Sequence, residues 1–184
     1  MTARLLAAAL LVAWPLQSLD DAARTAVRET RNPALETVAG ALSKHSRTAL
    51  ALAAVAGLIA GGAARAAAVE AAVALVPVNL AVEGLKRWTY RARPDGEHRR
   101  SNAAFPSSHS ANAFAVATVL ARRWRRAAVP AFVLAACVAW SRVYLDRHWL
   151  SDVAGGAALA IALTLLALLW WDARRRTKDV PATP

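Results

Sequence analysis

The sequence of 184 residues has a single cysteine, Cys137, which lies inside an apolar run. One cysteine cannot form an intramolecular disulfide, and it excludes a metal site built from several thiolates. Acidic residues are also scarce: 12 Asp and Glu stand against 23 Lys and Arg, for a formal net charge of +11. The basic residues occur in short clusters at the ends of apolar segments, as in membrane proteins. We therefore expect a bilayer as partner and no nucleic acid.

Long apolar segments dominate the chain, since 57% of the residues are hydrophobic. Five are clear, at residues 48–64, 66–85, 109–124, 127–145 and 153–171. A helix of about 19 residues spans about 28 Å, close to the hydrocarbon core of a bilayer. A weaker sixth, Leu5 to Leu19, contains Pro15 and predicts either a short membrane helix, which we favour, or a signal segment. Asp20 to Arg47 mixes charged and apolar residues as interfacial helices do.

This pattern predicts an all-α fold, an integral membrane bundle of about six transmembrane helices. Residues 1–178 are expected to form one domain, followed by a disordered tail over residues 179–184. With six spans, Arg4, Arg65, the loop ARRWRRA (residues 121–127) and the tail DARRRTKD (residues 172–179) fall on one side, which the positive-inside rule makes cytoplasmic. The segments 86–109 and 141–152 then lie together on the outer side.

The first polar motif is KRWTYRARP, from Lys86 to Pro94. Lys86 and Arg93 are seven residues apart, so the two cations can share a face if the helix persists. A basic anchor at the membrane edge is the alternative interpretation.

The second motif is FPSSHSAN, in which Ser107 is a good N-cap for a helix that carries His109 in its first turn. The amides of Ser107, Ser108 and His109 would point out of the helix N-terminus, where an anion binds readily. A capped helix start without a ligand is the alternative.

The third motif is SRVYLDRHWLSD, from Ser141 to Asp152. His148 and Asp152 are four residues apart, which stacks them on one helical face. The carboxylate could accept the Nδ1 proton of the imidazole, leaving Nε2 with a free lone pair for attack or proton abstraction. A purely structural His–Asp pair is the alternative.

Together the motifs predict three cations, helix-start amides and two histidines on one membrane face. Cations and amides suit a phosphoryl group, whose charge spreads over three oxygens in the transition state. One histidine could attack phosphorus in line while the other protonates the leaving oxygen. The order K-x6-RP, PS-x-H, SR-x5-H-x3-D is similar to the signature of the type 2 phosphatidic acid phosphatase (PAP2) and vanadium haloperoxidase superfamily. Ser108, where glycine is frequent, is a mild variation.

The resemblance implies a role for each matching residue. His148 would be the nucleophile that forms a phosphohistidine, and Asp152 would orient it. His109 would act as general acid and then as general base. The phosphate would be held by Lys86, Arg93 and Arg142 together with the amides near Ser107 and Ser108. No metal or other cofactor is implied.

The function we expect is hydrolysis of a lipid phosphate or diphosphate in the bacterial plasma membrane, with the active site on the outer face. Undecaprenyl diphosphate, phosphatidate and phosphatidylglycerol phosphate are candidate substrates. The alternatives are a vanadium-dependent haloperoxidase-like enzyme and a non-catalytic membrane protein.

Four further polar or aromatic residues near the motifs are given structural interpretations. Glu83 is expected to pair with Lys86. Asp146 and Arg147 are expected to be solvated neighbours, and Trp149 an interface anchor.

Overall fold

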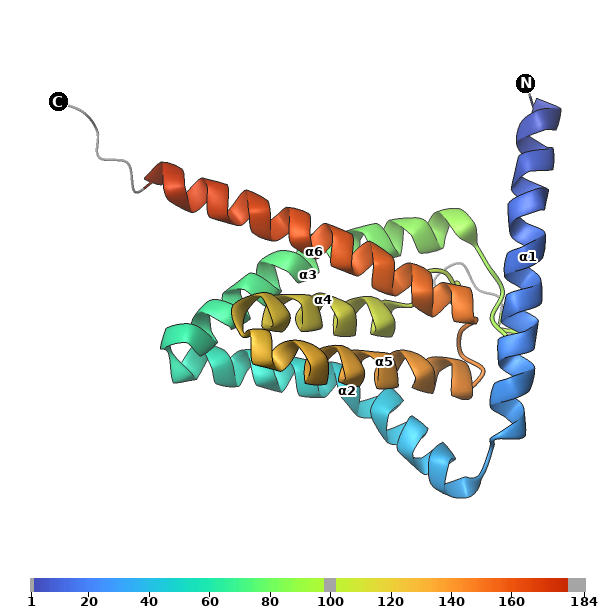
Figure 1. Cartoon of the computed structure of the whole chain (residues 1–184), viewed down its shortest axis with the longest axis horizontal. Coiled ribbons are helices and arrows are strands. Elements are labelled where there is room, and N and C mark those ends of the chain that lie inside the picture. Colours follow the sequence, from blue (N-terminus) through green and yellow to red (C-terminus); the bar gives the residue numbers. More distant parts are fainter. Residues whose placement is uncertain (1, 98–101, 179–184) are drawn as a thin grey trace.

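The structure is a computed structural model that describes residues 2–97 and 102–178. All the regular secondary structure in this part of the chain is helical. The elements are α1 (Thr2–Glu29), α2 (Pro33–Ala60), α3 (Gly62–Thr89), α4 (Ser108–Arg123), the 3-10 turn η2 (Arg125–Ala127), α5 (Ala128–Tyr144) and α6 (Leu150–Lys178). Helices α2 to α6 pack side by side, and α1 runs across one end of them (Figure 1). The predicted all-α fold is confirmed, whereas the predicted tail at residues 179–184 lies outside the described residues.

Local sequence explains where the N-terminal helices begin and turn. Asn32 caps α2, because its side-chain oxygen accepts the Leu35 N–H at 3.0 Å and Pro33 supplies the first helical residue. Gly61 and Gly62 have φ of +77° and +51°, which side chains disfavour, and they reverse the chain from α2 into α3.

Helix α4 lies at the centre of the bundle and packs through small residues. Ala111 and Ala115 are fully buried, and they meet Val78 and Val82 of α3 and Ala160 of α6. Alanine lets helix backbones approach closely, which favours the van der Waals contacts that hold helices together in lipid. The helices therefore approach one another closely at the centre of the bundle, and the start of α4 lies between α3 and α6.

Two adjacent glycines bring the first turns of α6 against the segment before α4. A Cβ at Gly155 would collide with the ring of Phe105, and a Cβ at Gly156 would lie 2.7 Å from the carbonyl oxygen of Ser107. The main chains also bond here, since Ser107 N–H donates to Asp152 O at 3.1 Å and Ser110 Oγ donates to Val153 O at 2.7 Å. The starts of α4 and α6 are thus locked together.

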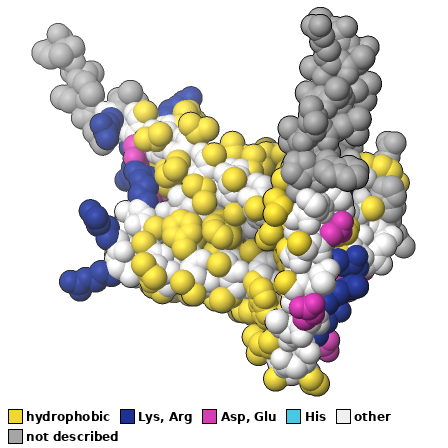
Figure 2. All heavy atoms as spheres, turned by 45° about the vertical axis from the view of Figure 1, so that its right-hand side comes forward, with side chains coloured by type: hydrophobic (Ala, Val, Ile, Leu, Met, Phe, Trp, Pro, Cys, Tyr) yellow, Lys and Arg dark blue, Asp and Glu magenta, His cyan; other side chains and the backbone are white. Residues whose placement is uncertain are grey.

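The outside of the bundle is suited to lipid. Three helical stretches among the described residues are long and apolar enough to cross a bilayer: Gly62–Thr89, Arg125–Tyr144 and Leu150–Arg176. Hydrophobic side chains cover the face of the bundle seen in Figure 2, and Lys and Arg side chains gather both at its end away from α1 and beside α1. Apolar sides between charged ends are typical of a membrane protein.

The course of α1 differs from the sequence-based expectation. Leu5 to Leu19, predicted as a membrane helix, belongs to the 28-residue α1, which crosses the end of the bundle and contacts α5 and α6 alone among the described helices (Figure 1). The cause is the polar C-terminal half of α1, whose charged side chains bond to the loops at that end. Charges of this kind are costly in lipid and favourable at its surface.

Candidate active site

The three sequence motifs meet at the end of the bundle that α1 crosses. Helices α3 and α5 end there, and α4 and α6 begin there (Figure 1). Seven of the eight predicted residues are buried, namely Lys86, Arg93, Ser107, Ser108, Arg142, His148 and Asp152. Segments far apart in sequence therefore deliver their polar side chains to one place, as the sequence predicts.

His148 is held by the main chain just before the second motif. Its Nδ1 lies 2.8 Å from the carbonyl oxygen of Ala104. A carbonyl can only accept a hydrogen bond, so Nδ1 carries the proton and Nε2 keeps its lone pair. Asp152 Oδ2 is 3.7 Å from Nδ1, near but beyond a hydrogen bond. The expected tautomer is present. The hydrogen bond from Nδ1–H goes to the Ala104 carbonyl, however, and not to Asp152 as the sequence predicts.

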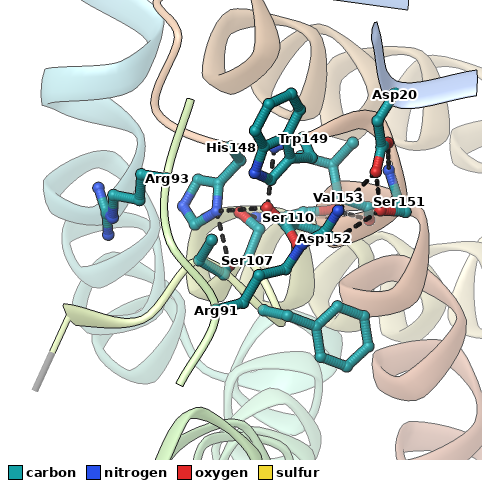
Figure 3. Close-up of polar contacts among 12 residues, drawn as sticks. Asp20, Arg91, Arg93, Ser107, Ser110, His148, Trp149, Ser151, Asp152 and Val153 are labelled. Carbon is teal, nitrogen blue, oxygen red and sulfur yellow. Dashed lines mark hydrogen bonds and ion pairs between the residues drawn. The ribbon is translucent and has the colours of Figure 1, made fainter. Parts of the chain in front are cut away.

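The carboxylate of Asp152 is fully buried and saturated by other donors. Trp149 N–H donates to Oδ2 at 2.8 Å, and Arg91 Nη1 donates to Oδ1 at 2.7 Å (Figure 3). Asp152 is therefore held beside the imidazole by these donors, without a direct hydrogen bond to His148.

Burial and charge keep His148 neutral. Burial lowers the pKa of His148 from its ordinary value of 6.5, and the positive charges of Arg142 and Arg93 lower it further, whereas Asp152 raises it. The net direction is downward. At neutral pH the imidazole is therefore unprotonated, which is the form that can attack an electrophile.

The three predicted cations are fixed by different partners. Arg93 Nε donates to the carbonyl oxygen of Asn102 at 2.9 Å, and its Nη2 donates to the Asn102 side chain. Arg142 donates through Nη1 to the hydroxyl of Ser43 in α2, and its buried Nε has no partner among the residues that the structure describes. An unpaired buried guanidinium N–H is a site for an anion.

Lys86 and its neighbours complete the cationic cluster. Lys86 Nζ lies 3.8 Å from Glu83 Oε1, which confirms the pairing expected from the sequence. Arg47 of α2, which the sequence did not single out, interacts electrostatically with Lys86 and Arg142. With Ser43, it shows that α2 forms one wall of the site.

The start of α4 agrees with the predicted cap but only partly with the predicted anion site. Ser107 accepts the Ser110 N–H on its hydroxyl at 3.4 Å, as an N-cap does. Its own amide donates to Asp152 O, so the Ser107 N–H is not free for a phosphate. The first-turn amides of Ser108 and His109 have no intrahelical acceptor and remain suited to an anion.

His109 is half-buried near the same cations. Arg142, Lys86 and His148 are all close enough to interact with it electrostatically. The two histidines of the second and third motifs therefore face one cationic region, as predicted from their order in the sequence.

Several residues that hold the site escaped the sequence analysis. Arg91 is two positions before Arg93, but nothing in its spacing distinguishes it from a membrane-edge arginine. Asp146, expected to be solvated, is buried and pairs with Arg24 and Arg28 of α1 and with Arg31 of the turn after α1. Burial raises the pKa of Asp146, but the hydrogen bonds from these arginines lower it more.

Trp149 also differs from its expected role as an interface anchor. Its indole N–H donates to the Ala92 carbonyl at 2.9 Å. The guanidinium carbons of Arg24 and Arg91 lie 5.4 and 5.7 Å from its ring centroid. Trp149 therefore packs under two arginines in the polar end, where cation–π contacts stabilise it.

An apolar cavity of about 860 Å³ lies between α2, α3, α4 and α5. Its lining is rich in alanine and contains Ala49, Ala53, Ala68 and Ala117. His45 and Ser46 also line the cavity. They lie in α2 between Ser43 and Arg47, the two residues of α2 near the site. The cavity thus extends from the level of the polar site into the apolar part of the bundle.

The fold is a helical membrane bundle, and its converging helix ends carry several cations and two histidines. This arrangement is suited to binding an anion such as a phosphate. The model of the PAP2 superfamily matches residues 67–176, more than half of the chain, and this stretch includes all three motifs. The chain belongs to the PAP2 superfamily.

Three known proteins of this kind are similar to the chain in sequence or in structure. Phosphatidylglycerophosphatase B of Bacillus subtilis is 37% identical over 95 residues, covering 45% of this chain and 47% of that protein. Lipid A 1-phosphatase of Porphyromonas gingivalis is 39% identical over 75 residues, covering 39% of this chain and 16% of that protein. The matched part spans less than half the length of these two relatives.

The third is a crystal structure of a transmembrane PAP2-type phosphatidylglycerolphosphate phosphatase from Bacillus subtilis. It superposes with a TM-score of 0.68 at 26% identity and covers 86% of this chain and 87% of that chain. The similarity extends over most of the bundle.

Proposed function

We propose that this protein is a membrane phosphatase that hydrolyses a lipid phosphate or diphosphate through a phosphohistidine. The observation that carries the proposal is the state of His148: buried, protonated on Nδ1 by the Ala104 bond, and surrounded by cations. A nucleophile beside a cationic cluster suits an electrophile that is itself an anion, and a phosphoryl group is one.

In the first step, Nε2 of His148 attacks phosphorus and a P–N bond forms while the P–O bond to the lipid breaks. The leaving oxygen takes a proton from His109, which burial and the surrounding cations disfavour in its protonated form and which the negative charges of the bound phosphate keep protonated. Lys86, Arg93 and Arg142 hold the phosphoryl oxygens, and Asp152 stabilises the positive charge that develops on the imidazole.

In the second step, water attacks the phosphohistidine and His109 takes one of its protons. The P–N bond breaks, inorganic phosphate is released and Nε2 recovers its lone pair. His109 ends protonated, ready for the next turnover.

The apolar cavity supports a lipid substrate over a soluble one. A chain of CH₂ groups gains about 0.8 kcal/mol for each group removed from water, so an Ala-lined cavity beside a phosphate site suits an ester with a long apolar tail. The names of the two curated relatives include a phosphatidylglycerophosphate and lipid A. We infer that the substrate of this chain is of the same broad class.

The test is phosphate release by the purified full-length protein in detergent, from phosphatidate, phosphatidylglycerol phosphate and undecaprenyl diphosphate. EDTA should leave the rate unchanged, because the cations of the site neutralise the phosphate. Vanadate should inhibit as an analogue of the five-coordinate state. Strict dependence on Mg²⁺ would contradict the mechanism, and bromide oxidation with bound vanadate would favour the haloperoxidase alternative.

A matched pair of variants tests the lipid tail. Ala53→Trp fills the cavity, whereas Ala51→Trp places the same side chain on an exposed position of α2 outside it. We expect Ala53→Trp to slow hydrolysis of long-chain phosphatidate and to spare a soluble aryl phosphate, and Ala51→Trp to spare both. Equal rates on phosphatidate in the two variants would sink the assignment of the tail to this cavity.

We further propose that the site faces outward across the plasma membrane. Lys and Arg side chains also gather at the end of the bundle away from α1, opposite to the site, and the positive-inside rule favours that end as the cytoplasmic one (Figure 2). With Cys137 replaced by alanine, Glu97→Cys should react with an impermeant maleimide in spheroplasts, and Arg126→Cys should react only after lysis. The reverse pattern would place the site on the cytoplasmic face.

A further inference from the structure

A carboxylate of the surface helix α1 is buried against the start of α6. Asp20 is only 1% exposed, although its neighbours Leu19 and Asp21 are exposed. Its Oδ1 accepts the Ser151 N–H at 2.8 Å, and its Oδ2 accepts the Ser151 hydroxyl at 2.6 Å. A buried charge is costly unless it is paired and hydrogen-bonded, so this position has a specific partner.

That partner is Arg91, which joins Asp20 to the catalytic carboxylate. Arg91 Nη2 lies 2.6 Å from Asp20 Oδ2, and Nη1 lies 2.7 Å from Asp152 Oδ1 (Figure 3). One guanidinium is therefore shared by two buried carboxylates from opposite ends of the sequence. Fork-shaped pairing of this kind fixes the orientation as well as the charge of both partners.

A second group of contacts holds α1 in the same place. Arg24 Nε donates to Asp146 Oδ1 at 2.9 Å, and its Nη2 donates to the Pro94 carbonyl. Arg31, in the turn directly after α1, donates to the carbonyl oxygen of Tyr144 at 2.7 Å. Helix α1 is thus bonded to the first motif and to both sides of the loop that carries His148.

We propose that Asp20 is a positioning residue for the reaction, which acts through Arg91 and Ser151 to set the orientation and charge of Asp152. The inference rests on the proposed phosphatase function. Because Arg91 is shared by two carboxylates, the three side chains together carry a net negative charge beside the imidazole, whereas Arg91 paired with Asp152 alone would carry none. Asp20 lies outside residues 67–176, so the family match assigns it no role.

Four other groups act on His148, and the proposal has to be separated from them. They are Asp152 of α6, Arg142 of α5, Arg93 of the loop after α3, and His109 of α4. None of them contacts Asp20, whose bonds go to Arg91 and Ser151. A change at Asp20 therefore reaches His148 through its charge, through this shared arginine and through the α6 start.

The experiment compares Asp20→Asn with Asp21→Asn in the full-length protein, with a soluble aryl phosphate as substrate. Asp21 is exposed and bonds only to Gln17 within α1, among the side-chain contacts of the described residues, so Asp21→Asn is a matched control. We expect Asp20→Asn to lower kcat by about 10-fold or more, as loss of a charged hydrogen bond does, with KM nearly unchanged. Asp21→Asn should match the wild type.

The second readout is the pKa of His148, followed by NMR of the ring protons in detergent. Asp20→Asn removes a negative charge and frees Arg91 for Asp152, so this pKa should fall. Arg91→Gln removes the shared positive charge, so the pKa should rise. A residue that merely held α1 in place would not give opposite shifts in the two variants.

The outcomes separate this inference from the proposed function. A wild-type protein without phosphatase activity would refute the function, while the pKa comparison would still report on Asp20. An active wild type whose Asp20→Asn variant keeps kcat and the pKa of His148 would overturn the positioning role. If Asp20→Asn does not fold, a pKa of His148 that fails to rise in Arg91→Gln would overturn it as well.

Discussion

Nδ1 of His148 lies 2.8 Å from the carbonyl oxygen of Ala104, closer than it lies to any oxygen of Asp152. The carbonyl is itself fixed, because the Ala104 N–H donates to the carbonyl oxygen of Arg91 at 2.8 Å. The orientation of the ring is thus set by the main chain of Ala104, which is itself bonded to the first motif and directly precedes the second. A side-chain substitution at Asp152 leaves that bond intact, and this makes the roles of the two residues separable by experiment.

His148→Ala should abolish turnover, with kcat reduced by about 10⁴-fold or more, because the variant has no nucleophile. Phosphate release measures the loss, and thermal unfolding should show the fold retained. Arg122→Ala, which breaks a pair with Asp172 at the far end of the bundle, is the control and should keep full activity. Rapid quenching should trap phosphate on wild-type protein, labile in acid and stable in alkali. Trapping on the variant at the wild-type level would remove His148 from its role.

The pH dependence should follow the lowered pKa of His148. Because the imidazole must be unprotonated to attack, the rate falls as pH drops through its pKa, and the acid limb of kcat/KM should lie below pH 6.5. Arg142→Gln removes a positive charge that lowers this pKa, so its acid limb should move to higher pH on the same substrate. A limb that stays in place or moves down would show that another group titrates.

Asp152→Asn should lower kcat by about 10- to 100-fold, which corresponds to a charge-assisted interaction of about 1.5–3 kcal/mol. The loss should be smaller than that of His148→Ala, because the Ala104 carbonyl still holds the Nδ1 proton. Steady-state kinetics on one substrate compare the two variants. Equal losses would mean that Asp152 controls the tautomer after all.

Much of the site follows from the sequence because its residues sit at helix ends with fixed spacing. Lys86, Arg93, His109, Arg142 and His148 all lie at the end of the bundle where the apolar pattern places them. The supporting contacts do not follow, because they join residues without any regular spacing. Asp20 and Asp152 are 132 positions apart and meet through one arginine, which looks in the sequence like any basic residue at a membrane edge.

Helix α1 shows the same limit at the level of the fold. Hydropathy over Leu5 to Leu19 predicts a span, but the charged residues that follow decide where the helix lies. Arg24, Arg28 and Arg31 converge on one buried carboxylate, Asp146, and such convergence is visible only in three dimensions.

The contact between α6 and the start of α4 gives the last prediction. A Cβ at Gly156 would lie 2.7 Å from the carbonyl oxygen and 3.3 Å from the amide nitrogen of Ser107, and neither is a flexible side chain. Gly156→Ala should therefore shift the helix start that carries His109 relative to His148. We expect activity to fall by about 10²-fold and stability by about 1–3 kcal/mol.

The matched control is Gly84→Ala in α3, where a Cβ meets nothing within 4 Å. In a helix this change should stabilise by about 0.5–1 kcal/mol and leave activity unchanged. Phosphate release and thermal unfolding on the two variants test the contact. If Gly156→Ala keeps the wild-type rate, the spacing between the α4 and α6 starts does not control the alignment of the two histidines.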